Sequence, residues 1–218
     1  MTRRQHGFGL LEALLALALG LMLLTAAGQV FASAYQTWRL QEASARLADD
    51  ARLVLQRLAQ DVRMTGMFGC LRPDALAYDD PAIAELFARP VQISMAGDGT
   101  LSSLTLIVAE LPRLPGPPDW TVTTDCRSWG RVVKGRAAAH DEALTFAIRR
   151  HVYQLHGGTL RLTSGGSTQP LLDQVKALRI TQVAGGRLDV RLDLYDAENR
   201  LEQQHALSVA FRNLGGEA

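Results

Sequence analysis

The chain has 218 residues and a formal charge of +1, with 23 Lys and Arg side chains against 22 Asp and Glu side chains. This length accommodates an N-terminal anchor and one head of moderate size, without requiring a second globular domain. The near-neutral charge lacks the basic surplus of a nucleic-acid-binding protein, so no nucleic-acid partner is expected. With only two cysteines the chain also has no Cys-rich zinc site.

An apolar run near the N-terminus contains a single ionisable side chain. From Leu10 to Phe31 the only such group is the carboxylate of Glu12. About 20 apolar residues are enough for a helix to cross a bilayer. The run therefore predicts a membrane-spanning helix over residues 8–31.

Glu12 is the unusual feature of this segment. A carboxylate inside a membrane helix costs about 2.5–3.5 kcal/mol on insertion scales, so a partner for it is expected. Arg3, Arg4 and His6 lie on the N-terminal side of the span, at its cytoplasmic end under the positive-inside rule. We therefore expect Glu12 to pair with a group outside its own chain.

The order of residues around Glu12 matches a known signal. A basic leader ending in Gly7 is followed by Phe8, a small residue, two aliphatic residues, Glu12 and an apolar span. This pattern resembles the class III signal of type IV prepilins and pseudopilins, although Gly9 stands where Ser or Thr is commoner. The resemblance implies cleavage after Gly7 by a prepilin peptidase and N-methylation of Phe8. It also implies that Glu12, the fifth mature residue, pairs with the terminal amine of a neighbouring subunit.

Two other interpretations of the N-terminus compete with this one. A secretory signal peptide also has a basic region and an apolar stretch, and residues 25–28 contain small side chains suited to cleavage. However, the run is longer than the usual apolar core of about 7–15 residues, and it contains an acid. A plain single-span anchor is the other alternative, but it leaves Glu12 unexplained.

Helical periodicity continues beyond the span. Apolar residues recur at spacings of three, four and seven, which indicates one apolar stripe on a helix. No proline interrupts residues 8–65, so we predict one helix over this range, with 8–31 in the membrane and 32–65 in the periplasm. Gly66 is placed to end it in a left-handed conformation. The stripe comprises Leu40, Leu47, Ala51, Val54, Leu55, Leu58 and Val62, and the other faces carry Arg39, Glu42, Arg46, Asp49, Asp50, Arg52, Arg57 and Asp61.

Three runs narrow the resemblance to one branch, the PilW-type minor pilins of the type IV pilus. They are Y-x-T-x-R-L-Q-E from Tyr35, D-x-R-M-x-G-x-x-G-C from Asp61, and F-R-N from Phe211. The resemblance implies a structural subunit, neither an enzyme nor a cofactor carrier. Its implied partners are other minor pilins, the major pilin, the inner-membrane assembly platform and a pilus-tip adhesin. The implied role is to prime assembly from a tip complex, after a period as a single-pass inner-membrane protein with a periplasmic head.

The two cysteines are predicted to pair. The basic N-terminal end places the rest of the chain in the periplasm, where disulfides form and persist. A bond between Cys70 and Cys126 closes a loop for which chain entropy predicts about 4 kcal/mol of stabilisation. Two unrelated free thiols are the alternative.

Residues 66–218 are predicted to form a β-rich head. Strict alternation of apolar and polar residues indicates a sheet with one buried face, which the stripe of the long helix would cover. The expected fold is therefore α+β and pilin-like, with one antiparallel sheet packed on the helix. Expected strands are 91–95, 101–110, 144–155, 159–163, 178–183, 188–194 and 207–211, with a short helix at 83–88, a proline-rich loop at 111–118 and a disulfide-stapled loop that includes Trp120, Cys126 and Trp129.

No residue pattern indicates catalysis or metal binding. There is no nucleophile elbow and no phosphate-binding loop. His151 and His156 are expected to be solvated, Gly165-Gly166-Ser167 to be a flexible turn, and the pairs Asp49-Asp50 and Asp79-Asp80 to be solvated faces or turns. The nearest alternative function is a J-type minor pseudopilin of a type II secretion system. An alternative of another class is a membrane-anchored periplasmic binding domain or enzyme.

Overall fold

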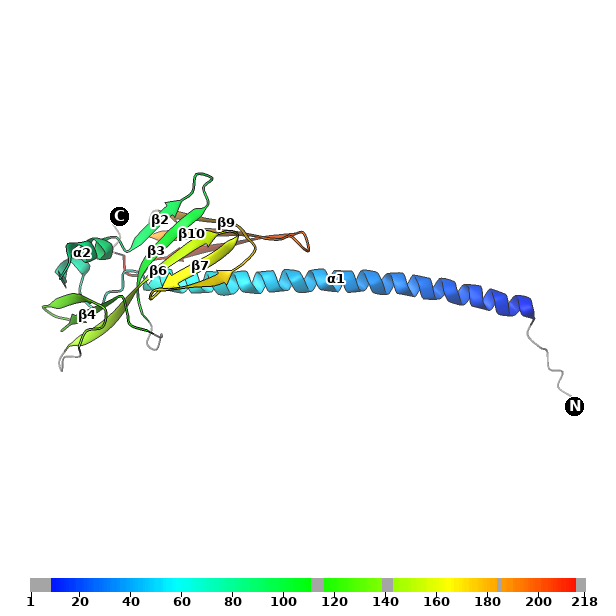
Figure 1. Ribbon diagram of the computed structural model, residues 1–218, viewed down its shortest axis with the longest axis horizontal. Helices are drawn as coiled ribbons and strands as arrows, with labels where there is room; N and C mark the ends of the chain where they lie inside the picture. The colour runs from blue at the N-terminus through cyan, green and yellow to red at the C-terminus, as the bar shows by residue number, and fades with distance from the viewer. Residues whose placement is uncertain (1–8, 111–115, 139–142, 184–185, 215–218) are drawn as a thin grey trace, which may run out of the picture. The chain divides into compact units, whose positions relative to one another are not determined.

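The computed structural model describes residues 9–110, 116–138, 143–183 and 186–214. The chain divides into two compact units, Met1–Arg46 and Leu47–Ala218, which we describe in turn. Its helical elements are α1 (Leu10–Met64), the 3₁₀ helix η1 (Pro73–Ala75) and α2 (Pro81–Ala88). The strands are β1 (Ala77–Tyr78), β2 (Val91–Met95), β3 (Leu101–Ala109), β4 (Trp120–Thr124), β5 (Gly130–Lys134), β6 (Leu144–His156), β7 (Thr159–Ser164), β8 (Ser167–Leu172), β9 (Val175–Val183), β10 (Arg187–Asp196) and β11 (Leu201–Ala210) (Figure 1).

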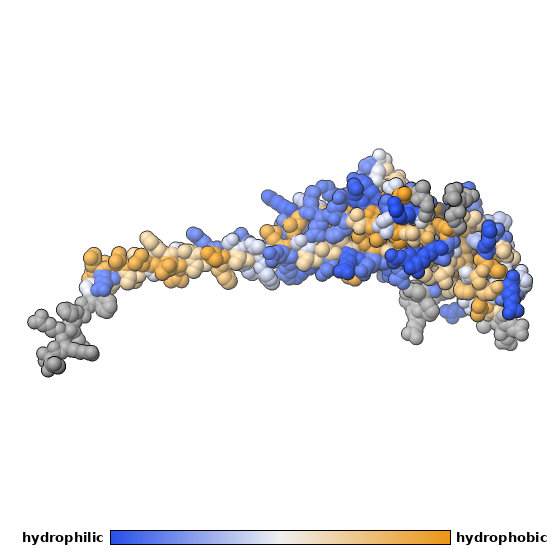
Figure 2. Space-filling model, turned by 180° about the vertical axis from the view of Figure 1, so that it is seen from behind, coloured by the Kyte–Doolittle hydropathy of each residue, from blue (hydrophilic) through white to orange (hydrophobic). Residues whose placement is uncertain are grey.

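The first unit contains the N-terminal part of α1. Its apolar side chains are exposed along the helix, and Figure 2 shows most of this surface in orange or pale orange, with a blue patch near the start of the helix. By length and composition, α1 is suited to cross a membrane. Leu40 belongs to this unit and is exposed, so its assignment to the buried stripe was wrong.

In the second unit, the apolar stripe of α1 is buried as predicted. Strands of both sheets pack against it in one core cluster. Burial of one helix face against sheets gives the α+β, pilin-like architecture expected from the periodicity. The buried stripe residues are Leu47, Ala51, Val54, Leu55, Leu58, Ala59 and Val62.

Helix α1 ends at Met64, one residue before the predicted boundary, and Gly66 follows two residues later. Gly66 has a φ of 77°, the left-handed conformation that glycine adopts without penalty, and its N–H donates to the Ile107 carbonyl over 3.1 Å. The side-chain amide of Asn213 donates to the carbonyls of Arg63 and Thr65, at 3.0 and 3.4 Å. Orphan carbonyls at the helix end are thus satisfied from the far end of the chain.

The head contains two sheets, whereas a single sheet was predicted. The larger sheet has eight strands in the order β1-β5-β4-β6-β3-β2, with β7 on β6 and β8 on β7. All its pairs are antiparallel except β1 with β5. The smaller sheet is antiparallel in the order β11-β10-β9. Alternation identifies the buried face of each strand but not which strands pair, and this explains the error.

Several strands escaped prediction for local reasons. All five residues of β4 are buried, so the strand lacks the alternation that marks a half-exposed strand. Strand β8 contains Pro170, which argues against strand assignment except at an edge. Residues 120–134 therefore form the β4–β5 hairpin with a five-residue loop, rather than one long loop. Strand β11 also begins six residues before the predicted start.

The hairpin between β6 and β7 was predicted correctly. Gly157 and Gly158 have φ values of 59° and 78°, which a two-residue type I′ turn requires at both central positions. Gly165 and Gly166 adopt similar values, 56° and 79°, between β7 and β8. The segment Gly165-Gly166-Ser167, predicted as a flexible turn, is therefore a second tight hairpin connection.

A second core cluster lies around α2 and the β4–β5 hairpin. The rings of Phe68 and Phe87 have centroids 4.3 Å apart, and Phe87 meets Trp120 edge-on at 5.8 Å. Trp120 is buried in this cluster, whereas Trp129 is exposed on the loop between β4 and β5. Of the two tryptophans expected near the disulfide, only Trp120 contributes to a core.

Candidate functional site

Glu12 is an exposed carboxylate in the first turn of α1. The turn begins at Gly9, whose carbonyl accepts the N–H groups of Glu12 and Ala13 at 3.0 and 3.2 Å. A negative charge at this position complements the positive end of the helix dipole. Within the described residues, the Glu12 side chain has no hydrogen bond or ion pair. Predominantly apolar side chains follow it for about five turns of helix, and none of the residues from Ala13 to Phe31 is ionisable.

The two processing residues predicted beside Glu12, Gly7 and Phe8, lie outside the described residues. Their roles as the cleavage position and the methylated terminus stay predictions. The basic leader residues Arg3, Arg4 and His6 also lie outside the described residues.

Cys70 and Cys126 form a disulfide in the head. Their Cα atoms are 5.3 Å apart although the residues are 56 positions apart in the sequence. The bond joins the segment after α1 to the loop between β4 and β5. It thereby links the end of the long helix covalently to the larger sheet.

Asp125 organises the loop that carries Cys126. Its carboxylate accepts the backbone N–H groups of Arg127, Ser128 and Trp129 at 2.9–3.0 Å, and the Ser128 hydroxyl at 2.8 Å. The backbone donors, first of all that of Arg127, lower the pKa of Asp125 well below its ordinary value. Cys126 itself has a φ of 60°, and its N–H donates to the Thr124 hydroxyl oxygen.

A buried polar cluster joins α1 to β6, and the sequence analysis missed it. Asp61, only 7% exposed, lies 2.7 Å from Nδ1 of His151, and the Tyr153 hydroxyl donates to the same carboxylate oxygen over 2.5 Å. Arg57 approaches this oxygen at 3.8 Å from the helix surface. Burial, followed by the charge of Asp61, raises the pKa of Tyr153, so its hydroxyl stays protonated as a donor.

Two predictions about this cluster were wrong. Asp61 was placed among the charged outer faces of the helix, and His151 was expected to be solvated, yet His151 is only 4% exposed. A signal was available in each case. Asp61 follows Leu58 by three residues and so falls on the buried stripe, and His151 and Tyr153 are two apart, on one face of a strand. His156 is exposed, as predicted.

A second buried charge pair joins the middle of β6 to the residue after β3. The Arg149 guanidinium is 2.8 Å from the Glu110 carboxylate, and both side chains are more than nine-tenths buried. Arg149 also donates to the Gly116 carbonyl at 3.1 Å. A side chain at Gly165 would collide with the guanidinium, so the glycine is needed for close approach as well as for its turn.

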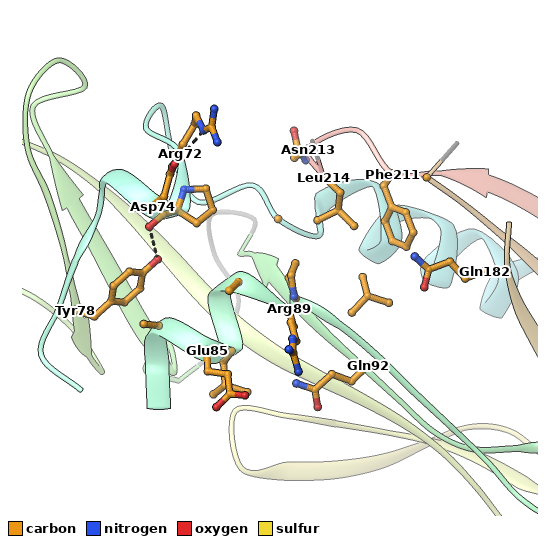
Figure 3. Close-up of a pocket in the computed structure, with 18 of the residues that line it drawn as sticks. Arg72, Asp74, Tyr78, Glu85, Arg89, Gln92, Gln182, Phe211, Asn213 and Leu214 are labelled. Carbon is orange, nitrogen blue, oxygen red and sulfur yellow. Dashed lines mark hydrogen bonds and ion pairs between the residues drawn. The ribbon is translucent and has the colours of Figure 1, made fainter. Parts of the chain in front are cut away.

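An open groove runs beside α2 and the outer strand β2. Figure 3 shows Phe211 and Leu214, from the segment after β11, on one side and Glu85 and Arg89, from α2 and its end, on another. Tyr78 also lines it and donates to the Pro73 carbonyl over 2.9 Å. The lining mixes apolar side chains with charged ones.

The burial of the Tyr78 hydroxyl can be tested by measuring how folding stability depends on pH. Burial, with a smaller contribution from Asp74, raises the pKa of Tyr78 from 10.0 to about 12. Between pH 10 and 12 the unfolded chain releases this proton while the folded chain keeps it, so stability falls as pH rises. Tyr78→Phe should flatten this decline in urea-unfolding free energy, leaving the share due to Tyr153. An unchanged slope would contradict the assignment.

Metal binding finds no support in the part of the chain that the structure describes. There, no group of three or more His, Cys, Asp or Glu side chains is arranged to hold a metal ion. Asp80 accepts the Ala82 N–H at the start of α2, a local capping role, whereas Asp79 pairs with Arg131, 52 positions away on β5.

Comparison with known proteins places a family motif at the N-terminus. A family model described as the prokaryotic N-terminal methylation motif matches residues 2–28. The match contains Gly7, Phe8 and Glu12 together with most of the apolar run. No curated protein and no solved structure matched the chain.

Proposed function

We propose that this protein is a minor pilin of the type IV pilus, a structural subunit that primes pilus assembly in a tip complex with other minor pilins. The methylation motif supports a structural subunit of the type IV pilin or pseudopilin kind, processed by a prepilin peptidase and assembled with other pilins. The minor-pilin role is the further step. It draws on the head and on the three sequence runs that resemble PilW-type proteins.

The observation that carries the proposal is the exposed Glu12 carboxylate at the start of an apolar helix. Exposed apolar side chains are stable in lipid, and equally so among like helices in the core of a filament. A carboxylate in such surroundings needs a cationic partner. The methylated amine of a neighbouring subunit, at Phe8 of that copy, would supply one. Pairing then favours extraction from the membrane only when a neighbour is present to receive the subunit.

The segment after β11 supports the narrower proposal, that the protein is a PilW-type minor pilin. Asn213, in the F-R-N run, donates to carbonyls at the end of α1, inside the run that begins at Asp61. Two runs that resemble PilW-type proteins therefore meet in space and stabilise one feature, the exit of the chain from the long helix. The Cys70–Cys126 disulfide reinforces that exit and suits a periplasmic location.

The proposed organisation follows from these features. Residues 1–7 form the leader, 8–31 the membrane half of the helix, 32–65 its periplasmic half, and 66–218 the head. The protein resides in the bacterial inner membrane as a single-pass subunit before it enters the pilus. Its proposed partners are the major pilin, other minor pilins, the assembly platform and a tip adhesin.

The test is Glu12→Ala in the native host. This variant should insert into the membrane as well as the wild type but fail to support pilus formation, because its carboxylate no longer pairs with a neighbour. Surface pili are counted by microscopy and membrane content by immunoblot. Glu42→Ala is the matched control, since it removes a half-exposed carboxylate that pairs with Arg46 on the same helix. Normal piliation by Glu12→Ala would refute the assembly role.

N-terminal mass spectrometry provides the control for processing. The mature wild-type chain should begin at Phe8 and carry one added methyl group. A chain that begins at Met1 or near Ala27 would instead support a membrane-anchored periplasmic domain. A J-type pseudopilin would be processed in the same way, so mass spectrometry does not distinguish the two functions. A strain that lacks the gene for this protein does. Loss of pili in that strain supports the proposal, and loss of protein secretion with normal pili supports the pseudopilin.

A further inference from the structure

Two aromatic side chains stand exposed on α1 just beyond its apolar run. Tyr35 is 51% exposed and Trp38 is 56% exposed, and their ring centroids are 5.9 Å apart. Residues three apart lie on the same side of a helix, so the rings form one patch. In the first unit no other element covers this patch.

The patch lies at a sharp chemical boundary. Between Glu12 and Arg39 there is no Asp, Glu, Lys or Arg, whereas Arg39, Glu42 and Arg46 follow within the next eight residues. Hydroxyls near the boundary are satisfied within the helix. Thr25 donates to the Met22 carbonyl at 2.8 Å and Thr37 to the Ser33 carbonyl at 3.0 Å. The surface of the helix is therefore suited to contact lipid up to Trp38 and to contact water from Arg39 onward.

Helix length places this boundary at a specific depth. An α-helix rises about 1.5 Å per residue. Leu10 to Trp38 covers about 42 Å, which matches a bilayer with its headgroup layers, about 40–45 Å. Tyr35 and Trp38 consequently fall in the outer headgroup layer. Amphipathic aromatic rings are enriched at this level of membrane proteins.

We propose that Tyr35 and Trp38 bind the periplasmic headgroup layer of the bilayer and fix the depth of α1 in the membrane. The partner is the lipid surface, and the proposal rests on the proposed function only for the membrane location of the helix. Glu12 lies about 39 Å from Trp38 along the helix, so the same contact holds the carboxylate at the opposite headgroup layer. There it reaches water, where the insertion cost is lower than at the bilayer centre.

This placement has a consequence for assembly. A carboxylate held at the cytoplasmic surface is level with the N-terminus of any neighbouring subunit anchored in the same way. The aromatic pair would therefore align the acceptor on one subunit with the amine on the next before either leaves the membrane. Without the anchor, the helix would be free to slide along the membrane normal and lose this alignment.

The test measures the depth of Trp38 directly. Full-length mature protein is reconstituted at low protein density into phosphatidylethanolamine–phosphatidylglycerol vesicles that contain lipids brominated either near the carbonyl end or near the methyl end of the acyl chain. Wild type should show fluorescence quenching that is stronger for the first lipid than for the second. Trp38→Phe should lose the quenched component. Trp129→Phe is the matched control, because Trp129 is exposed in the head and its removal should leave the quenching unchanged.

The outcomes separate this inference from the proposed function. Quenching that is absent, or stronger for the deep-brominated lipid, overturns the anchor. Blue-shifted but unquenched Trp38 emission also overturns it, because another helix would then cover the ring. If the anchor stands while Glu12→Ala forms normal pili, the assembly role alone fails. If Trp38 is unquenched while Glu12→Ala abolishes pili, only the anchor fails.

Discussion

Replacing Asp61 with alanine is expected to destabilise the folded head by about 2–6 kcal/mol. The substitution leaves both His151 Nδ1 and the Tyr153 hydroxyl without their shared acceptor. Both side chains are almost fully buried, so water cannot replace the carboxylate. Each buried group that loses its partner costs about 1–3 kcal/mol. This variant should be among the most damaging single changes in the helix.

The measurement is urea unfolding of the purified full-length chain, followed by tyrosine and tryptophan fluorescence and by circular dichroism. Asp50→Ala is the matched control, because Asp50 is an exposed aspartate on the same helix. It should change the unfolding free energy by no more than about 0.5 kcal/mol. Equal effects of the two substitutions would show that the cluster contributes nothing beyond surface charge.

A graded series would separate the members of the cluster. Tyr153→Phe removes one donor but leaves the bond between Asp61 and His151, so its cost should be about 1 kcal/mol. In the Asp61→Ala background the same change should cost less, because the hydroxyl no longer has an acceptor. This coupling identifies a network rather than two independent contacts.

Loss of the Cys70–Cys126 disulfide is expected to reduce stability by about 4 kcal/mol. The bond spans 56 positions, and closing a loop of that length removes much of the conformational freedom of the unfolded chain. The effect should arise largely in the unfolded state, so the double variant Cys70→Ser/Cys126→Ser should fold to the same head. Its unfolding midpoint should shift to lower urea under non-reducing conditions.

Reduction of the wild type provides the internal control for the disulfide. Dithiothreitol should lower the wild-type unfolding free energy to that of the double variant and leave the double variant unchanged. A loss of less than about 1 kcal/mol on reduction would contradict the expectation. It would mean that the Asp125 hydrogen bonds and the second core cluster hold the loop without the bond.

The candidate assembly site could be predicted from the sequence because its residues are close together in the chain. Glu12 stands out as one carboxylate in an apolar run, and the residues on either side of it form a contiguous signal. The same composition leaves Glu12 without a partner on its own helix, because the residues within one helical turn of it are apolar or glycine. Gly7 and Phe8 were identified by the same contiguous pattern, and their processing is a matter for the experiments above.

In the rest of the chain, local sequence patterns predicted some structural features and missed others. The buried stripe of α1, its end at Gly66 and the Gly157-Gly158 hairpin were read from periods of 3.6 and 2 and from turn residues, all of which depend on neighbours in sequence. Strand β4 was missed because full burial removes the period. The single predicted sheet became two because strand pairing is a long-range choice that alternation does not encode.

The sequence by itself determined that residues 10–31 form an apolar helix bearing one acid, that the helix continues amphipathically, and that a β-rich head follows. These properties are set by residues a few positions apart. Only the tertiary structure decided that Asp61 pairs with His151 and Tyr153, because these partners lie about 90 positions away on β6. Likewise, only the fold brought Asn213 to the end of α1, since that contact depends on how the last strand and the helix pack together.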